Sequence, residues 1–369
     1  MKIPLIDLRA QYLELKTEID HAMNRVMNSG VYIGGPEVEN LEREIATTTG
    51  TKYAVSVGNG TDALLLAMEA AGIGAGDEVI TTPFTFFATA ESIIRCGAVP
   101  VFADIDEKTH NLSPEAAAAC ITPRTKAILP VHIFGQPADM DAFRRLASRH
   151  GLLLIEDACQ ALGAAYKGRP VGGIGDLGCI SFFPTKNLGG YGDGGIVVTN
   201  DEQLADKVRL LSHHGSRKKY FHEIVGCNSR LDPLQAAVLR VKHSKLMEWN
   251  ERRKEVAAYY NHTLQGTSIH PPYKASQGDH VYHLYVTQCN DRASVAHGLE
   301  RLGISTGHYY PCPLHLQQAL RGLGYREGEF PVTEQACRES LALPVSPHLT
   351  KHMQNYVMEK LLDVMRGEA

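Results

Sequence analysis

The stretch Leu152-Leu153-Leu154-Ile155-Glu156-Asp157 places four apolar residues directly before two carboxylates. A short apolar run bounded by polar residues is typical of a strand buried on both faces of a parallel sheet. A carboxylate at the end of such a strand is costly to bury unless a cation or hydrogen-bond donors meet it. The stretch therefore predicts a buried strand of an α/β sheet and a partner for Asp157.

The segments on either side of this stretch alternate between strand and helix patterns. Strands are expected at residues 53–57, 78–80, 100–102, 127–131 and 195–199, and helices at 63–71, 88–96 and 140–150. This alternation predicts a large domain with a mostly parallel central sheet that helices cover on both faces. Before it, residues 8–27 are expected to form one amphipathic helix that ends at Gly30, and residues 37–47 a second helix.

The pattern changes toward the C-terminus. Residues 231–260 predict a long, mostly helical stretch. Beyond Gly266 the patterns mix, with a strand expected at 281–286 and a helix at 294–302. We therefore expect two domains, a large one over residues 1–245 and a smaller C-terminal α+β domain over residues 246–369.

The bulk composition narrows the class of protein. The 369 residues are 44% hydrophobic, and the formal net charge is only −4, a balance that does not favour a nucleic-acid or membrane partner. The N-terminus lacks the apolar stretch of a signal peptide, and no run of about 18 apolar residues predicts a membrane span. The eight cysteines stand singly, which favours free thiols in the cytoplasm, and no spacing predicts a metal site.

A glycine-rich segment, Gly58-Asn59-Gly60-Thr61-Asp62-Ala63-Leu64, follows the strand expected at 53–57 and opens a helix. Backbone N–H groups at a helix start, with the Thr61 hydroxyl beside them, form a site for an anion such as phosphate. Thr61 or Asp62 could instead serve only as a helix cap. The spacing matches neither a dinucleotide-binding fingerprint nor a P-loop.

Two further positions suit a flat, charged ligand. Three aromatic residues, Phe84, Phe86 and Phe87, follow the strand at 78–80, where one ring could stack on a ligand, while plain core packing is expected for at least two of the three. Asp157 can face a cationic ring nitrogen, with Gln160 one helical turn later beside a ring substituent. Asp157 could instead only cap a helix.

Lys186 is the last of the residues that suit such a ligand. In Ser181-Phe182-Phe183-Pro184-Thr185-Lys186-Asn187-Leu188-Gly189-Gly190 it stands between aromatic residues and a glycine pair. Burial there would lower the pKa of the amine, as Schiff-base chemistry requires. Phosphate, ring face, ring nitrogen and aldehyde then each have a contact. The segments together predict a pyridoxal 5′-phosphate (PLP) site, in which Lys186 carries the aldehyde and Asp157 keeps the ring nitrogen protonated.

Over nearly its full length the chain resembles the DegT/DnrJ/EryC1/StrS family of nucleotide-sugar aminotransferases. The matching segments lie, in order, at residues 58–64, 83–90, 155–163, 181–188, 191–195, 226–237 and 310–317. The resemblance implies the fold-type-I aminotransferase fold and a homodimer with active sites shared between the subunits. The family also contains sugar dehydratases that carry histidine in place of the lysine, so Lys186 indicates transamination.

The resemblance also implies roles for single residues. Lys186 and Asp157 match the catalytic positions. The cofactor-binding positions are Gly60, Thr61, Asp62, Phe86, Asp157, Gln160, Ser181 and Lys186, together with Asn228, which matches an asparagine that reaches the phosphate from the partner subunit. The substrate-binding positions are Arg230, His308, Tyr309 and His315. Many relatives carry His-Tyr-Pro where this chain has Tyr309-Tyr310-Pro311, so whether His308 or Tyr309 contacts the sugar stays open.

The implied reaction moves an amino group from L-glutamate, by way of pyridoxamine 5′-phosphate (PMP), to a nucleotide-diphosphate-linked keto-sugar. The stretch 310–317 resembles that of 3-aminotransferases and favours a 3-keto sugar over a 4-keto sugar. The product would be an amino sugar for surface polysaccharide, lipopolysaccharide or antibiotic biosynthesis. A sugar dehydratase or another fold-type-I PLP enzyme is the nearest competing function. A non-catalytic PLP-binding regulator and an α/β protein without a cofactor are more distant ones.

Overall fold

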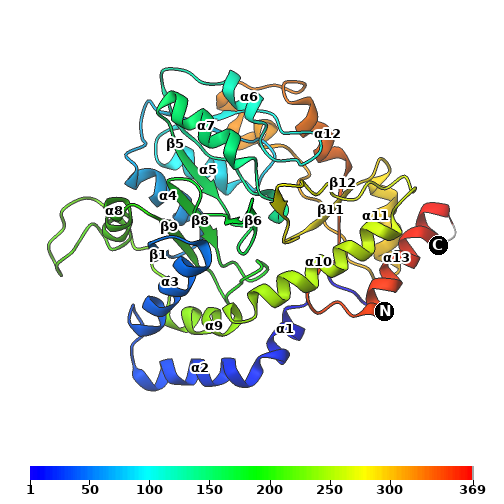
Figure 1. Ribbon diagram of the computed structural model, residues 1–369, viewed down its shortest axis with the longest axis horizontal. Helices are drawn as coiled ribbons and strands as arrows, with labels where there is room; N and C mark the ends of the chain where they lie inside the picture. Colours follow the sequence, from blue (N-terminus) through cyan, green and yellow to red (C-terminus); the bar gives the residue numbers. More distant parts are fainter. Residues whose placement is uncertain (368–369) are drawn as a thin grey trace.

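A seven-stranded sheet lies at the centre of the computed structural model, which describes residues 1–367 (Figure 1). The strand order is β1-β9-β8-β5-β4-β2-β3, and β9 runs antiparallel to both of its neighbours. The strands are β1 (Tyr53–Val57), β2 (Glu78–Thr81), β3 (Val99–Phe102), β4 (Thr125–Ile128), β5 (Leu153–Asp157), β8 (Leu177–Ser181) and β9 (Gly195–Thr199). The predicted α/β class with a mostly parallel sheet is confirmed.

Helices cover both faces of this sheet. One face packs against α3 (Pro36–Thr49), α6 (Pro114–Ala119), α7 (Met140–His150) and α9 (Pro233–His243). The other face packs against α4 (Gly60–Ala70), α5 (Ala88–Arg95) and α8 (Glu202–Ser212). Side chains alternate along a strand, so in β5 Leu154 joins the first core cluster and Ile155 the second. Glu156 and Asp157 continue this alternation, which is why the two carboxylates leave β5 on opposite faces.

A smaller cluster of elements follows the long helix α10 (Leu246–Thr263). It contains the antiparallel pair β11 (Tyr285–Gln288) and β12 (Ser340–Leu343) with helices α11 (Arg292–Arg301), α12 (Pro331–Glu339) and α13 (Lys351–Arg366). Ile3 pairs with Ile304 and is buried in the same core, so the N-terminal segment packs on this cluster, as Figure 1 shows. The division at residue 245 stays a prediction.

The remaining elements are short or peripheral. Helices α1 (Leu8–Glu14) and α2 (Lys16–Ser29) lie outside α9. A small three-stranded sheet joins β6 (Ala165–Tyr166), β7 (Arg169–Pro170) and β10 (Gly278–Asp279), and single 3-10 turns are η1 (Ile133–Gly135), η2 (Leu314–Leu316) and η3 (Gln318–Leu323). Within residues 1–367, every helix is too short or too polar to cross a membrane.

The structure differs from the predicted elements in several places. The strand expected at 281–286 begins later, because β11 spans Tyr285–Gln288. The single helix expected at 8–27 is wrong: Leu15 leaves the helical conformation, with φ −117° and ψ 18°, and buries its side chain beside Trp249. The stretch 231–260 forms two helices, α9 and α10, separated at Ser244 and Lys245. Strand β8 was not predicted, because Gly178 interrupts its apolar pattern. A Cβ at Gly178 would lie 2.1 Å from the carbonyl oxygen of Gly172, so only glycine fits.

Candidate active site

A cavity of about 910 Å³ opens where strands β2, β5 and β8 end, at the carboxyl edge of the sheet. Ligands of open α/β sheets bind at this edge, and the volume suits a cofactor with part of a substrate. The predicted site residues that line the cavity are Gly60, Thr61, Asp62, Phe86, Asp157, Gln160, Ser181, Lys186 and Tyr309. Residues from distant parts of the chain therefore meet at one site. A PLP site requires this, because the predicted contacts with its phosphate, ring and aldehyde come from different segments.

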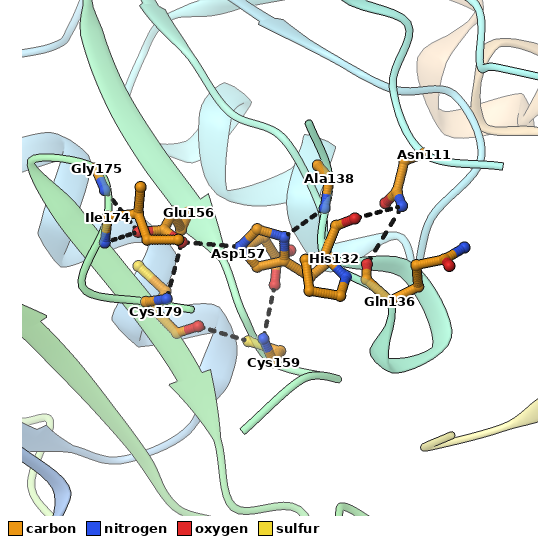
Figure 2. Close-up of polar contacts among 12 residues, drawn as sticks. Asn111, His132, Gln136, Ala138, Glu156, Asp157, Cys159, Ile174, Gly175 and Cys179 are labelled. Atoms are coloured by element: carbon orange, nitrogen blue, oxygen red, sulfur yellow. Dashed lines mark hydrogen bonds and ion pairs between the residues drawn. The ribbon is translucent and has the colours of Figure 1, made fainter. Parts of the chain in front are cut away.

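Asp157 ends β5, and its side chain is only 4% exposed. Thr89 Oγ1 donates a hydrogen bond of 2.9 Å to Oδ2. The backbone N–H of Cys159 donates one of 3.2 Å to Oδ1, as Figure 2 shows. The possibility that Asp157 only caps a helix is wrong, since the next α-helix along the chain begins at Glu202. Its carboxylate faces a cavity, where it can meet a cation.

Lys186 lies in the turn that follows β8. Its backbone N–H donates to the carbonyl of Phe183 at 2.9 Å, and the next residue, Asn187, anchors the turn through a 2.7 Å hydrogen bond to Asn250 Oδ1. Burial lowers the pKa of the Lys186 amine below its ordinary 10.5, while the nearby Cys159 and Asp157 oppose that change. A lowered pKa increases the fraction of neutral amine, which is the nucleophilic form.

The start of α4 forms one end of the cavity. Asn59, not Thr61 or Asp62, caps this helix, because its side chain accepts the Asp62 N–H at 2.8 Å. A capping role for Thr61 or Asp62 is therefore wrong. A Cβ at Gly60 would lie 2.7 Å from Ser181 Cβ, so the helix start and β8 approach as closely as glycine allows. The N-terminal N–H groups of α4, with the hydroxyls of Thr61 and Ser181, suit an anion.

Phe86 and Gln160 also line the cavity. Phe86 is 60% exposed, so core packing does not account for its position, whereas Phe84 is fully buried. Gln160 donates from its amide nitrogen to Tyr310 Oη at 2.9 Å and accepts the N–H of Phe134 at 2.8 Å. Its side chain is thus held in one orientation at the cavity wall.

Four predicted residues lie away from the cavity lining. Asn228 is exposed and pairs its backbone with His213, while the buried Nε of Arg230 has no hydrogen-bond partner among the described residues. His308 Nε2 lies 2.7 Å from the carbonyl oxygen of Cys337. His315 is buried, with Nε2 3.1 Å from Glu334 Oε1 and its ring against Phe330. Their roles in binding cofactor or substrate stay predictions.

The cavity also contains residues that the sequence did not single out. Thr89, Tyr310 and His283 line it, and all three contact or neighbour predicted residues. The i to i+4 spacing of Thr85 and Thr89 after β2 was the one available signal, and their hydroxyls lie 3.1 Å apart. Tyr310 lies in the family-matching segment 310–317 without a role having been predicted for it, and no motif marked His283.

A lysine and a carboxylate at the carboxyl edge of a mostly parallel seven-stranded sheet, beside a helix start suited to an anion, define a fold-type-I aminotransferase. The chain belongs to the DegT/DnrJ/EryC1/StrS aminotransferase family, whose sequence profile matches residues 13–362. The predicted family and fold are confirmed.

Curated relatives match nearly the whole chain. A pleiotropic regulatory protein of Geobacillus stearothermophilus is 48% identical over 99% of each chain. The dTDP-3-amino-3,4,6-trideoxy-α-D-glucose transaminase of Streptomyces venezuelae is 46% identical over 95% of this chain and 93% of its own. The UDP-2-acetamido-2-deoxy-3-oxo-D-glucuronate aminotransferase of Pseudomonas aeruginosa is 44% identical over 94% and 96%.

Solved structures of related proteins also match nearly the whole chain. The crystal structure of S. venezuelae DesV in complex with a ketimine intermediate matches with a TM-score of 0.97 at 45% identity, over 99% of this chain and 98% of DesV. The structure of NtdA from Bacillus subtilis, with bound cofactor PMP, matches with a TM-score of 0.90 at 34% identity, over 96% and 82%.

Proposed function

We propose that this protein is a PLP-dependent aminotransferase that moves an amino group from L-glutamate to a nucleotide-diphosphate-linked keto-sugar. The observation that carries the proposal is the meeting of Lys186 and Asp157 in one cavity with the start of α4. The 46% identical relative is a transaminase for a dTDP-linked sugar, and the 44% identical relative acts on a UDP-linked one. Both relatives support a nucleotide-linked substrate for this chain.

The residues present fit the cofactor. Gly60, Thr61 and Ser181 form a cradle that a Cβ at Gly60 would fill, which suits the phosphate. Phe86 is exposed at the cavity for contact with the ring face, and Lys186 lines the same space for the aldehyde. When bound, the protonated pyridine ring of PLP accepts the electrons that are left on carbon when a proton is removed.

Asp157 has a defined task in this arrangement. Its carboxylate is buried and accepts two hydrogen bonds, yet no cation pairs with it among the described residues. A protonated ring nitrogen supplies that missing positive charge. Asp157 then holds the proton on this nitrogen, because a buried carboxylate strongly favours a cation beside it.

Lys186 moves protons on carbon. Since burial lowers the pKa of its amine, a larger fraction is neutral and able to accept a proton. Lys186 Nζ removes the proton from the α-carbon of the amino donor, and in the second half of the reaction it delivers a proton to the sugar carbon that receives the amine. The amide of Gln160, which a hydrogen bond to Tyr310 fixes, would lie beside the bound ring and orient it.

We further propose that the sugar carries its keto group at C3 and that the protein is a homodimer. The names of both sugar-acting relatives place the amine or the keto group at position 3. Asn228 and Arg230 lie outside the cavity of their own chain, which agrees with a role at a partner's site. His308, Tyr309 and His315 are the proposed positions for sugar contact or its support, and Tyr309 lines the cavity directly.

The test is a spectrum and an assay. The purified protein with PLP should show the visible band of lysine-bound cofactor and should form an amino sugar from L-glutamate and a 3-keto UDP- or dTDP-sugar. Lys186→Ala should lose both, while Lys207→Ala, which alters an exposed lysine of α8, should keep both. A preparation that stays colourless with PLP overturns the cofactor assignment. Amination at C4 but not C3 overturns the sugar assignment.

A further inference from the structure

A second buried carboxylate lies directly behind the active-site aspartate. Glu156 precedes Asp157 in β5, points to the opposite face and is 0% exposed. It accepts hydrogen bonds of 2.6 to 2.8 Å from three backbone N–H groups of the turn 172–175. The fourth donor is His132, whose Nε2 lies 2.9 Å from Glu156 Oε2 (Figure 2).

The hydrogen bonds assign the protonation of this pair. The backbone N–H of Ala138 donates to His132 Nδ1 at 3.0 Å, so Nδ1 carries no proton. The ring proton is therefore on Nε2, which donates it to Glu156. Glu156 acts only as an acceptor, as an ionised carboxylate does, and its four donors offset the cost of burying the charge.

The same histidine also fixes the backbone of Asp157. The N–H of His132 donates to the carbonyl of Asp157 at 3.0 Å, and the N–H of Asp157 donates to the carbonyl of Pro130 at 3.0 Å. Val131 pairs with Asp157 in the parallel direction, beyond the last residue of β4. His132 thus bonds β5 twice, once through its backbone to Asp157 and once through its ring to Glu156.

Two consecutive carboxylates at the end of one strand create a problem of register. A shift of one residue would turn Glu156 into the cavity and Asp157 to the back. The two faces of the sheet at the end of β5 differ in the hydrogen-bond donors that they offer to a carboxylate. The back offers four donors to the longer side chain, and the cavity side offers Thr89 and the N–H of Cys159 to the shorter one.

We propose that His132 and Glu156 are positioning residues that determine which carboxylate faces the cofactor and that hold Asp157 against its ring nitrogen. The proposal rests on the proposed function of the cavity as a PLP site. It assigns to the back of β5 a role in the reaction, although neither residue lines the cavity.

Two variants of His132 separate its two hydrogen bonds. In His132→Gln the amide nitrogen can replace Nε2 and still donate to Glu156, whereas the bond from Ala138 is lost. In His132→Asn the shorter side chain can accept from Ala138 in place of Nδ1, but the bond to Glu156 is lost. Each variant removes one hydrogen bond, and His132→Asn should lower thermal stability more, because the bond that it removes goes to a buried charge.

The full-length protein loaded with PLP is then titrated with pH while the visible band is recorded. In His132→Asn a loosened Asp157 should shift the midpoint of this titration by about one pH unit. Turnover in His132→Asn should fall about 10- to 100-fold, as for a misplaced catalytic group. His132→Gln should keep the wild-type midpoint and most of the turnover.

The outcomes are distinguishable. If the wild-type protein forms no visible band, the proposed PLP function fails. If it does, and the midpoint of His132→Asn equals that of wild type, the positioning role alone is overturned. A midpoint shifted equally in both variants also overturns it, since the bond to Glu156 would not matter. If His132→Asn cannot be obtained folded, Glu156→Asp replaces it, because the shorter acid keeps the charge but cannot reach all four donors.

Discussion

Thr89 Oγ1 donates a hydrogen bond of 2.9 Å to Asp157 Oδ2, and this bond joins helix α5 to the end of strand β5. Both residues are buried, and the hydroxyl of Thr85 lies 3.1 Å from that of Thr89. Thr89 is the side-chain donor to the carboxylate, while Cys159 supplies a backbone donor on the other oxygen. The orientation of the active-site aspartate thus depends on a helix 68 residues earlier in the chain.

Replacing Thr89 with valine, which has nearly the same shape, should lower turnover or PLP affinity without abolishing PLP binding. A hydrogen bond to a charged group contributes roughly 1.5–3 kcal/mol, so turnover or PLP affinity should fall about 10- to 100-fold. Both are measured on the purified variant, by assay and by titration with PLP. Thr89→Ser retains the hydroxyl and should stay near wild type. Asp157→Asn, which removes the charge itself, should cut turnover further while PLP still binds. Wild-type behaviour of Thr89→Val would contradict the role given to this bond.

A side chain at Gly60 should damage the phosphate end of the cavity. In Gly60→Ala the new Cβ would lie 2.7 Å from Ser181 Cβ, closer than carbon atoms normally approach, so α4 or β8 must shift. Overpacking of this kind costs about 1–3 kcal/mol, and here we expect it to appear as weaker PLP binding. Gly322→Ala is the matched control, since nothing lies within 4 Å of a Cβ there. Equal PLP dissociation constants for the two variants would show that the close approach at Gly60 is unimportant.

His283 should act as a neutral acceptor in the cavity. Asn187 donates its amide hydrogen to Asn250 Oδ1, so its oxygen faces His283 Nδ1 at 3.2 Å and Nδ1 carries the ring proton. Burial, with the positive charges of Lys186 and Arg253, lowers the pKa of His283 well below 6.5. The free Nε2 is then an acceptor on a ring that lines the cavity.

His283→Asn keeps a donor toward Asn187 but loses this acceptor, so kcat/KM for the keto-sugar should fall about tenfold, as for a lost hydrogen bond. His283→Gln should restore part of the activity, because its amide oxygen can replace Nε2. Because the lowered pKa of His283 favours the neutral ring, the acid limb of the kcat/KM profile should not move in either variant. An acid limb that shifts would show that His283 titrates during the reaction.

Lys242 should make stability depend on pH. Its side chain is 0% exposed, its amine donates to the carbonyl of Gly189 at 2.7 Å, and it lies 4.1 Å from the ring centroid of Tyr191. Burial lowers the pKa of Lys242 from 10.5 to about 7. Between these two values the unfolded chain holds the proton and the folded chain releases it, so stability rises with pH in this window.

Lys242→Met removes this dependence. The free energy of unfolding of wild type relative to the variant should therefore rise by up to about 1.4 kcal/mol per pH unit above pH 7. Denaturant unfolding of both proteins at about pH 7 and about pH 9 measures the difference. Lys207→Met on the exposed surface of α8 serves as the control, with no change in slope expected. Parallel curves for wild type and Lys242→Met would contradict the lowered pKa.

Much of the fold follows from local patterns. The apolar run before Glu156 and Asp157 predicted β5, and its position among alternating strands and helices predicted the parallel sheet. Strand β8 was not predicted, because the requirement for glycine at position 178 comes from the nearby carbonyl of Gly172, which the local pattern does not show. The break in the helix at Leu15 was not predicted for a similar reason. A contact with Trp249, far along the chain, outweighs the helical pattern.

Some residues of the site could likewise be predicted from the sequence, and others were found only in the structure. Short-range sequence order was sufficient to find Lys186 and Asp157 and to predict that both would face one ligand, because each stands in a segment whose chemistry is unusual for a solvated side chain. It did not single out Thr89 or His283, which reach the cavity from α5 and from the segment before β11.

The sequence by itself therefore determined the chemical groups of this protein and the order in which they occur along the chain. The sequence predicted that Asp157 faces the ligand, but only the tertiary structure shows why Asp157, and not Glu156, faces the cavity. Alternation along β5 sends Glu156 and Asp157 to opposite faces, but their order does not say which face is which. That choice depends on the register of β5, which His132 and the amides of the turn 172–175 set through contacts between distant parts of the chain.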